Sequence, residues 1–283
     1  MKICRSIFDL GSELPALAGK TIGFVPTMGF LHEGHLSLVR KCREENQKTV
    51  VSIYVNPAQF GPAEDLQRYP RDPEKDTAIL EKENVDLLFM PGNDEMYPRA
   101  YCTYVNVEGL EARLCGKSRP GHFRGVATVV LKLFNLVRPQ RAYFGQKDAQ
   151  QAIIIRHMVH DLDLAVQVRV MPIVRDADGL ALSSRNVYLS LAERQVALLL
   201  PAALQRADAL VRSGVGESQA IRDSMQKELA RDPLLATEYI AIVRLQDLVE
   251  IPAIEPGNTL IAAAVRVGRT RLIDNLLLGD LSC

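Results

Sequence analysis

The apolar residues of this chain alternate regularly between two patterns from residue 21 to residue 172. Short apolar runs typical of strands lie at residues 21–25, 50–55, 85–90, 141–144 and 166–171. Amphipathic helical patterns lie between them, at residues 36–45, 73–82, 126–137 and 149–159. Because the Val- and Ile-rich runs are continuous, they suit strands that are buried on both faces. This rhythm predicts an α/β fold with a parallel sheet and helices on both of its faces.

The pattern changes after residue 173. A turn signal lies at residues 176–179, and Ser190 with Glu193 forms a capping box before a helix that we predict to end near residue 211. A second helix is predicted at 218–231, strands at 238–243 and 260–267, and an apolar tail at 272–278. We therefore expect two domains, an α/β domain at residues 1–173 and a smaller α+β domain at residues 174–283.

Composition narrows the class of protein. Of the 283 residues, 47% are hydrophobic and 24% are charged, which is typical of a globular protein. Lys plus Arg and Asp plus Glu both number 34, so the net charge is zero and no nucleic-acid partner is expected. The five cysteines lack metal-ligand spacing, and we find neither a signal peptide nor a membrane span. We expect a cytoplasmic protein without a membrane partner.

The segment Pro26-Thr27-Met28-Gly29-Phe30-Leu31-His32-Glu33-Gly34-His35 follows the first apolar run and precedes a helical pattern. The start of a helix presents unpaired N–H groups and the positive end of the macrodipole, so it suits a phosphate. A zinc site is an alternative, but zincin helices carry histidines four apart and these are three apart. A purely structural role, in which the glycines only allow a tight turn, is a second alternative. We favour phosphate binding, because an HxGH cluster after a strand is typical of adenylyl-transferring folds.

Two further segments carry groups that suit phosphate. Residues 145–148, with the sequence GQKD, follow a predicted strand, and Lys147 supplies a point charge. Residues 182–186, with the sequence LSSRN, combine two hydroxyls with the Arg185 guanidinium. Class I aminoacyl-tRNA synthetases also combine an early HxGH segment with a late segment that closes over the triphosphate of ATP. The Ser-Ser-Arg segment takes the place of this late segment here.

Neutral amides lie near two strand ends. Gln59 follows the run at 50–55, and Gln151 follows the run at 141–144. Both side chains donate and accept hydrogen bonds, which suits a substrate with a hydroxyl and a carboxylate. The loop at 119–125 adds three cationic candidates. Since the carboxyl ends of parallel strands meet at one edge of a sheet, we expect the strand-end groups to converge there.

Five stretches make the chain resemble the pantothenate synthetase family, the pantoate–β-alanine ligases. They are PTMGFLHEGH, YVNPAQFGPAEDLQRYPRD, RPGHFRGVATVVLKLFNLVRP, YFGQKDAQQ and DGLALSSRN. The resemblance implies a Rossmann-like nucleotidyltransferase domain, a smaller C-terminal lid domain and a homodimer. It also implies ATP with Mg²⁺ and the condensation of pantoate with β-alanine through a pantoyl adenylate, releasing pyrophosphate and AMP.

The resemblance also implies residue roles. The catalytic residues are expected to be His32, His35, Lys147 and Arg185. The residues expected to bind ATP are Pro26, Thr27, Met28, Gly29, His32, His35, Gly145, Gln146, Lys147, Asp148, Val174, Leu182, Ser183, Ser184 and Arg185. The residues expected to bind pantoate or β-alanine are Asn56, Gln59, Tyr69, Arg119, His122 and Gln151. No protein ligand of a metal is assigned.

Two other functions remain as alternatives. Another adenylyl transferase of the same fold would share the histidine pair, but it would need more cations for a second phosphate. A non-enzymatic ATP-binding protein would keep the glycines, but it has no need of the histidines, Lys147 and Arg185 together.

Overall fold

The computed structural model describes residues 1–62 and 64–280. Its internal contacts divide the chain into two compact units. Unit 1 contains Met1–Gly145 and Gln151–Met171, and unit 2 contains Gln146–Gln150 and the described part of Pro172–Leu281. The domain boundary after residue 173 stays a proposal, and residues 281–283 of the second expected domain lie outside the described residues.

Unit 1 is built on a six-stranded sheet of order β1-β4-β3-β2-β5-β6. Every neighbouring pair is parallel, which confirms the expected α/β class. The strands are β1 (Lys2–Cys4), β2 (Ile22–Thr27), β3 (Lys48–Ile53), β4 (Leu87–Phe89), β5 (Arg141–Gly145) and β6 (Gln167–Met171). The sequence pattern does not predict β1, because only one of its three residues is buried. The strand order reverses between β2 and β5, so ligands are expected outside the carboxyl ends of these strands.

Helices connect the strands of unit 1. They are α1 (Ile7–Glu13), α2 (Glu33–Glu45), α3 (Pro73–Lys82), α4 (Asn93–Met96), α5 (Cys115–Ser118), α6 (His122–Val137) and α7 (Ala149–Asp161). Two short 3₁₀ turns of unit 1 are η1 (Leu14–Leu17) and η2 (Pro57–Gln59), and a third, η3 (Gln146–Asp148), precedes α7 and belongs to unit 2. The predicted bounds of α3 are confirmed, and the Asp72 carboxylate caps this helix by accepting the Lys75 N–H at 3.1 Å. Helix α1 is not predicted, although Ser6 and Asp9 form a capping box at its start.

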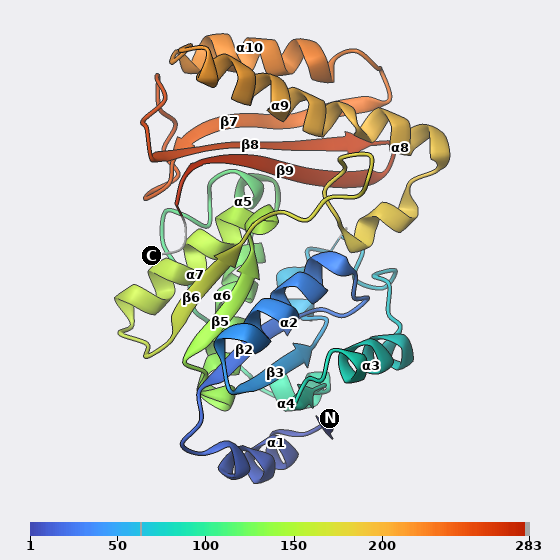
Figure 1. The fold of residues 1–283 in the computed structure, drawn as a ribbon, viewed down its shortest axis with the longest axis vertical. Coiled ribbons are helices and arrows are strands. Elements are labelled where there is room, and N and C mark those ends of the chain that lie inside the picture. The colour runs from blue at the N-terminus through green and yellow to red at the C-terminus, as the bar shows by residue number, and fades with distance from the viewer. Residues whose placement is uncertain (63, 281–283) are drawn as a thin grey trace. The chain divides into compact units, whose positions relative to one another are not determined.

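Both faces of the sheet are covered by helices (Figure 1). On one face, Val39 and Cys42 of α2 pack with Val25, Val51 and Tyr143 of the strands. On the other face, the Phe134 ring of α6 meets the Phe24 and Phe144 rings edge-on, with centroids 6.5 and 6.4 Å apart. Neighbouring residues on one strand therefore enter opposite cores, which explains why the strands are apolar without interruption.

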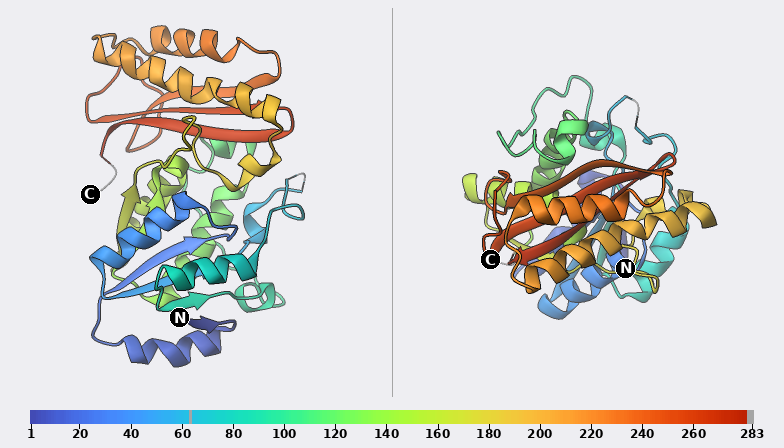
Figure 2. Two further views of the ribbon diagram at one scale, coloured as in Figure 1. Left: turned by 45° about the vertical axis from the view of Figure 1, so that its right-hand side comes forward. Right: turned by 90° about the horizontal axis from the view of Figure 1, so that it is seen from above.

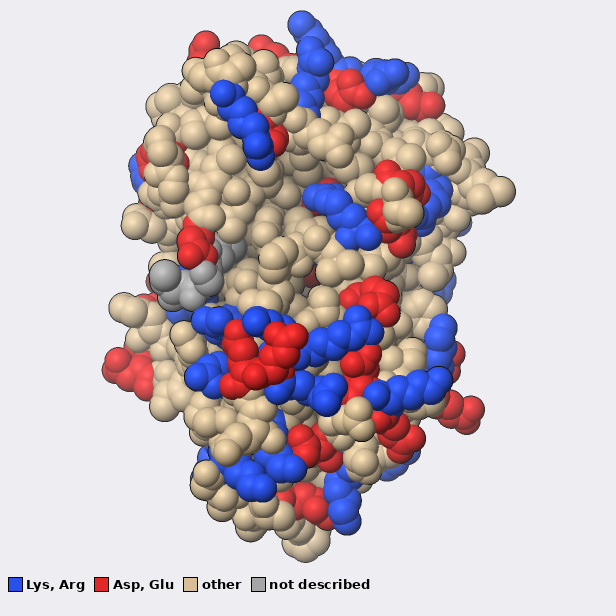
Figure 3. Space-filling model, in the orientation of Figure 1, with Lys and Arg blue, Asp and Glu red and all other residues tan. Residues whose placement is uncertain are grey.

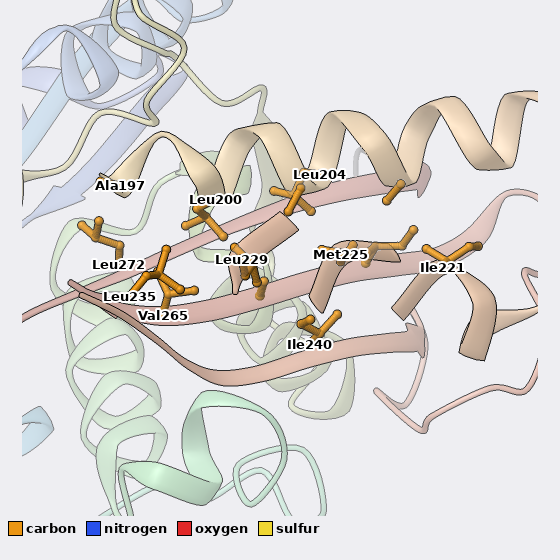
Figure 4. Close-up of a cluster of buried hydrophobic side chains, with 14 of the residues drawn as sticks. Ala197, Leu200, Leu204, Ile221, Met225, Leu229, Leu235, Ile240, Val265 and Leu272 are labelled. Atoms are coloured by element: carbon orange, nitrogen blue, oxygen red, sulfur yellow. The ribbon is translucent and has the colours of Figure 1, made fainter. Parts of the chain in front are cut away.

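Unit 2 is a three-stranded antiparallel sheet with helices on one face (Figure 2). Its strands are β7 (Leu235–Arg244), β8 (Asn258–Val267) and β9 (Thr270–Gly279), and its helices are α8 (Leu191–Ala197), α9 (Leu199–Arg212) and α10 (Ser218–Leu229). A 3₁₀ turn, η4 (Ser184–Tyr188), precedes α8. The buried side chains of α9 and α10 meet those of the strands in one apolar core (Figure 4). The smaller α+β unit is as predicted.

Two expectations for unit 2 are corrected. The single helix predicted from residue 190 is two helices, which meet at Leu198. Pro201 lies in the first turn of α9, where its missing N–H costs nothing, but it would break a continuous helix. The apolar tail at 272–278 is the core of strand β9.

Charges on the surface are mixed in sign. Figure 3 shows Lys and Arg side chains beside Asp and Glu, and α2 illustrates this arrangement. Its Arg40 pairs with Glu33 and Glu83, and its Lys41 pairs with Glu44. No helix among the described residues combines the length and the apolar character that crossing a bilayer requires.

Phe134 tests the packing of the unit 1 core. We expect Phe134→Ala to lower the free energy of unfolding by about 3–5 kcal/mol, because it leaves a cavity between two buried rings. The matched control is Phe8→Ala, since the Phe8 side chain is 82% exposed. Urea denaturation measures both variants, and equal losses would contradict this account of the core.

Candidate active site

The turn between β2 and α2 begins the candidate site in unit 1. Gly29 and Phe30 both have left-handed backbone conformations, with φ of 80° and 52°. The buried Asp76 carboxylate of α3 accepts the N–H groups of Phe30 and Leu31 at 2.7 and 2.8 Å. A Cβ on Gly29 would lie 3.0 Å from this carboxylate and 2.9 Å from Ile53, so the tight turn favours glycine. Asp76 therefore fixes the point from which α2 starts.

His32 and His35 lie at the start of α2 with their rings 4.1 Å apart. The His32 Nδ1 accepts the Gly34 N–H at 3.2 Å, and the His35 Nδ1 accepts the His32 N–H at 3.3 Å. An Nδ1 that accepts a hydrogen bond carries no proton, so each neutral ring carries its proton on Nε2. Both histidines are therefore held as Nε2–H donors, a form that suits phosphate oxygens.

Met28, Gln59 and Asn56 lie together beside this turn. The Gln59 Nε2 donates to the Met28 sulfur at 3.1 Å, and the Asn56 Nδ2 donates to the Gln59 Oε1 at 3.1 Å. Gln59 is 8% exposed. An amide has two N–H groups and two acceptor lone pairs, so further hydrogen-bonding capacity remains for a ligand.

A network on the other side of Gln59 fixes its backbone. The His122 Nδ1 bonds the Gln59 carbonyl at 2.7 Å, and the Arg119 Nη1 bonds the His122 Nε2 at 3.0 Å. Since the carbonyl only accepts and the guanidinium only donates, His122 is neutral with its proton on Nδ1. Arg119 in turn pairs with Glu64, with Nε and Oε1 2.8 Å apart. Arg119 and His122, expected to bind substrate, hold Gln59 in place.

Helix α6 approaches the same segment closely. A Cβ on Gly125 would lie 2.2 Å from the Ala58 carbonyl oxygen, so only glycine fits there. The Gly125 carbonyl accepts the Asn56 Nδ2 at 3.1 Å. Gly125 and Glu64 lie in two of the stretches that carry the family resemblance but received no role there, and Asp76 lies outside all five.

The remaining expected residues of unit 1 lie on its strands, loops and helix α7. Pro26 and Thr27 end β2, and the Thr27 hydroxyl accepts the Gly29 N–H at 3.2 Å. The buried Tyr69 ring packs against Phe60, Gly145 ends β5, and Gln151 lies in the first turns of α7. A cavity of about 450 Å³ opens beside the turn, with Met28, Gly29 and Asp76 among its lining.

Unit 2 carries the other expected residues. Gln146, Lys147 and Asp148 form η3, where the Lys147 Nζ lies 4.0 Å from the Asp148 Oδ1. The segment that leads to residues 182–186 is folded back by an antiparallel bridge between Arg175 and Ala181. Next to this bridge, the Leu182 N–H donates to the Val174 carbonyl at 3.0 Å. The Ser183 hydroxyl accepts the Arg185 N–H at 3.3 Å and starts η4, whose first residue is Ser184.

Among the residues that the structure describes, no group of three or more His, Cys, Asp or Glu side chains is arranged to hold a metal ion. Burial raises the pKa of the Cys42 thiol to about 12, so this thiol stays protonated and is a poor nucleophile.

Comparison with known proteins identifies the family. The sequence model of the family described as pantoate–β-alanine ligase matches residues 2–277. The chain belongs to the pantoate–β-alanine ligase family. It is therefore a ligase that forms an amide bond, and the resemblance stated from five motifs is confirmed.

Relatives in sequence and structure agree with this assignment. A pantothenate synthetase of Thermotoga petrophila is 54% identical over 281 residues, covering 99% of this chain and 100% of the relative. One of Pseudothermotoga lettingae is 53% identical over 280 residues, covering 99% and 96%. The crystal structure of the Thermus thermophilus pantothenate synthetase has a TM-score of 0.94 and 47% identity, covering 99% and 100%. That of a Francisella tularensis pantoate–β-alanine ligase, complexed with an ATP compound and β-alanine, has a TM-score of 0.82 and 34% identity, covering 98% and 97%.

Asp76 gives this site a dependence on pH. Burial raises the pKa of the Asp76 carboxyl above its usual range, and the N–H groups of Leu31 and Phe30 oppose this only in part. A raised pKa in the folded state means that the folded protein binds more protons than the unfolded chain between the two pKa values. This contribution to stability is complete below about pH 4, the ordinary carboxyl value, and is lost as the pH rises through the raised pKa.

The test compares the wild type with Asp76→Asn, which cannot titrate. The variant presents an NH₂ to one backbone N–H, so we expect a loss of about 1–3 kcal/mol in the free energy of unfolding. The wild-type advantage should be largest below about pH 4 and should shrink at higher pH. Chemical denaturation across a pH series measures it, and an advantage that grew with pH would disprove the assignment.

Proposed function

We propose that this chain condenses pantoate with β-alanine in two steps, using ATP and releasing pyrophosphate and AMP. The observation that carries the proposal is the pair of Nε2–H donors at the start of α2, beside the buried Gln59 amide. Family membership supports it, as does the relative from Francisella tularensis that is complexed with an ATP compound and β-alanine.

In the first step, a carboxylate oxygen of pantoate attacks the α-phosphorus of ATP. The new P–O bond forms as the bond to pyrophosphate breaks, so the protein has to stabilise charge rather than supply a nucleophile. His32 and His35 donate hydrogen bonds from Nε2 to phosphate oxygens, with His35 as the principal donor of the pair. Pro26, Thr27, Met28, Gly29 and Gly145 line the nucleotide.

The groups of unit 2 supply the positive charge. Lys147 neutralises the phosphates, and Asp148 beside it accepts a ribose hydroxyl. Ser183, Ser184 and Arg185 bind the triphosphate. Gln146, Val174 and Leu182 pack on the nucleotide. The hydrogen bond between Val174 and Leu182 supports this role, because it shapes the segment that presents the two serines.

Side-chain amides hold the pantoate. Gln59 and Gln151 bind the hydroxyl and carboxylate of pantoate, with Asn56 orienting Gln59 and Tyr69 closing the apolar side. Arg119 and His122 act on the substrate through the Gln59 backbone, a role that their contacts support. In the second step, the β-alanine ammonium gives a proton to water and the free amine attacks the adenylate carbonyl, so that the amide C–N bond forms, the C–O bond to AMP breaks and the second N–H proton leaves to solvent. A closed site protects this adenylate from water.

We also propose Mg²⁺ as the ion that accompanies ATP. This ion commonly binds substrate phosphates with only one or two carboxylates, which fits a described chain without a metal-binding cluster. Bound to the phosphates, Mg²⁺ neutralises charge. The family resemblance further supports a homodimer, a lid role for the C-terminal domain and a cytoplasmic location.

The direct test is mass detection of products from the purified protein. With ATP, Mg²⁺, pantoate and β-alanine, we expect pantothenate and AMP in equal amounts, and pyrophosphate without pantothenate when β-alanine is omitted. Chelation of Mg²⁺ should stop the first step and, with it, the formation of pantothenate. Formation of ADP, or ATP binding without AMP under these conditions, would refute the proposal.

The residue roles predict a second result. We expect His35→Ala and Lys147→Ala each to lower the rate of pyrophosphate release by roughly two or more orders of magnitude, the scale of a transition-state contact. His160→Ala is the matched control, because the His160 side chain is 89% exposed and pairs with Asp161. Single-turnover kinetics measure the effect, and a near-normal rate for His35→Ala would show that its role is misassigned.

A further inference from the structure

The turn that carries Lys147 is anchored to strand β9 by one side chain. The Asn275 Nδ2 donates to the carbonyl oxygens of Gln146 and Lys147, at 2.9 and 3.0 Å. The Asn275 Oδ1 accepts the Gln146 Nε2 at 3.1 Å. Asn275 is only 5% exposed, and all of these residues belong to unit 2. Both of its N–H groups are therefore used on two successive carbonyls.

These two carbonyls have a particular relation to Lys147. One belongs to the peptide group before the Lys147 Cα and the other to the peptide group after it. Fixing both peptide planes fixes the backbone dihedrals of Lys147, and with them the direction of its Cα–Cβ bond. Since the Lys147 stem is long and flexible, the backbone sets the region that its ammonium reaches.

The residue before Asn275 is held just as firmly. The Asp274 carboxylate accepts two hydrogen bonds from the Arg175 guanidinium, at 2.6 and 3.0 Å, and its side chain is 1% exposed. The Asp274 Oδ1 also accepts the Asn275 N–H at 2.8 Å. Arg175 donates to the Gly179 carbonyl at 3.1 Å, in the turn that leads to Ser183. The strand segment that anchors η3 is therefore itself rigid.

We propose that Asn275 is a positioning residue for Lys147, so that the amide on β9 sets the place of the ammonium that neutralises phosphate. This inference rests on the proposed function of Lys147. It adds that the reaction depends on a residue that need not touch substrate and that lies 128 positions further along the chain.

The experiment is a double-mutant cycle on the full-length protein. Asn275→Ala, Lys147→Ala and the double variant are compared by the rate of pyrophosphate release at saturating ATP, Mg²⁺ and pantoate. We expect Asn275→Ala to lower kcat by about 10- to 100-fold, the scale of a misplaced catalytic group. In the Lys147→Ala background the same change should have no further effect, because the group that it positions is gone.

Two variants serve as controls. Asn258→Ala removes an asparagine of the neighbouring strand β8, whose Nδ2 donates to Glu255 at 3.0 Å, and it should leave the rate unchanged. Asn275→Ser keeps one donor and should retain more of the rate than Asn275→Ala; it replaces that variant in the cycle if Asn275→Ala does not fold. Hydrogen exchange of the peptide spanning residues 146–150 gives a readout independent of catalysis and should speed up in Asn275→Ala but not in Asn258→Ala.

The outcomes separate the inference from the proposed function. If Lys147→Ala is impaired while Asn275→Ala matches Asn258→Ala in rate and exchange, the positioning role is wrong and the function of Lys147 stands. Additive losses in the double variant would also overturn it, since they indicate general destabilisation. If Lys147→Ala keeps the wild-type rate, the proposed role of Lys147 fails, and an impaired Asn275→Ala then overturns the inference as well.

Discussion

The hydrogen bonds from Phe30 and Leu31 to the Asp76 carboxylate determine where α2 begins, and most of the unit 1 site follows from that point. Two consecutive left-handed residues, Gly29 and Phe30, turn the chain sharply after β2, so that the N–H groups of Phe30 and Leu31 point at one carboxylate. His32 can then cap the helix, and the caps in turn fix which ring nitrogens carry protons. A buried acid with no expected contact to substrate thus determines the hydrogen-bonding character of two histidines.

Gln59 is likewise held in place by neighbouring residues. Its side chain faces Met28 and Asn56, while its carbonyl is bound by His122, which Arg119 and Glu64 support. Every link in this series is a donor that meets an acceptor, so a neutral amide is placed by charged groups that stay paired with one another. Such an arrangement favours a polar, hydroxylated substrate, because the charge nearby is already neutralised.

Much of the fold could be predicted, because strands that are buried on both faces appear in the sequence as continuous runs of β-branched residues. In unit 2 the pattern misses the break between α8 and α9 and gives β9 only as an apolar tail, whereas strands β2 to β8 and helix α3 follow from periodicity and caps. The short strand β1 does not, since its place depends on pairing with β4, more than eighty residues away. The same holds for the candidate site. Its motif residues could be recognised in the sequence, whereas Asp76, Gly125 and Asn275 act through tertiary contacts that no local pattern shows.

Strand β9 carries Asp274 and Asn275 on opposite sides of its pleat, and its pairing with β8 is set by a turn of only two residues between Val267 and Thr270. A single amino acid inserted into that turn would slip the register by one and exchange the directions of the two side chains. The tip of this hairpin is thus a surface position at which length is under constraint, and so is the identity of Gly268, which has a φ of 56° and whose added Cβ would lie 2.2 Å from the Glu193 Oε1. Deletions and insertions there should be far rarer among functional descendants of this sequence than substitutions of Arg269.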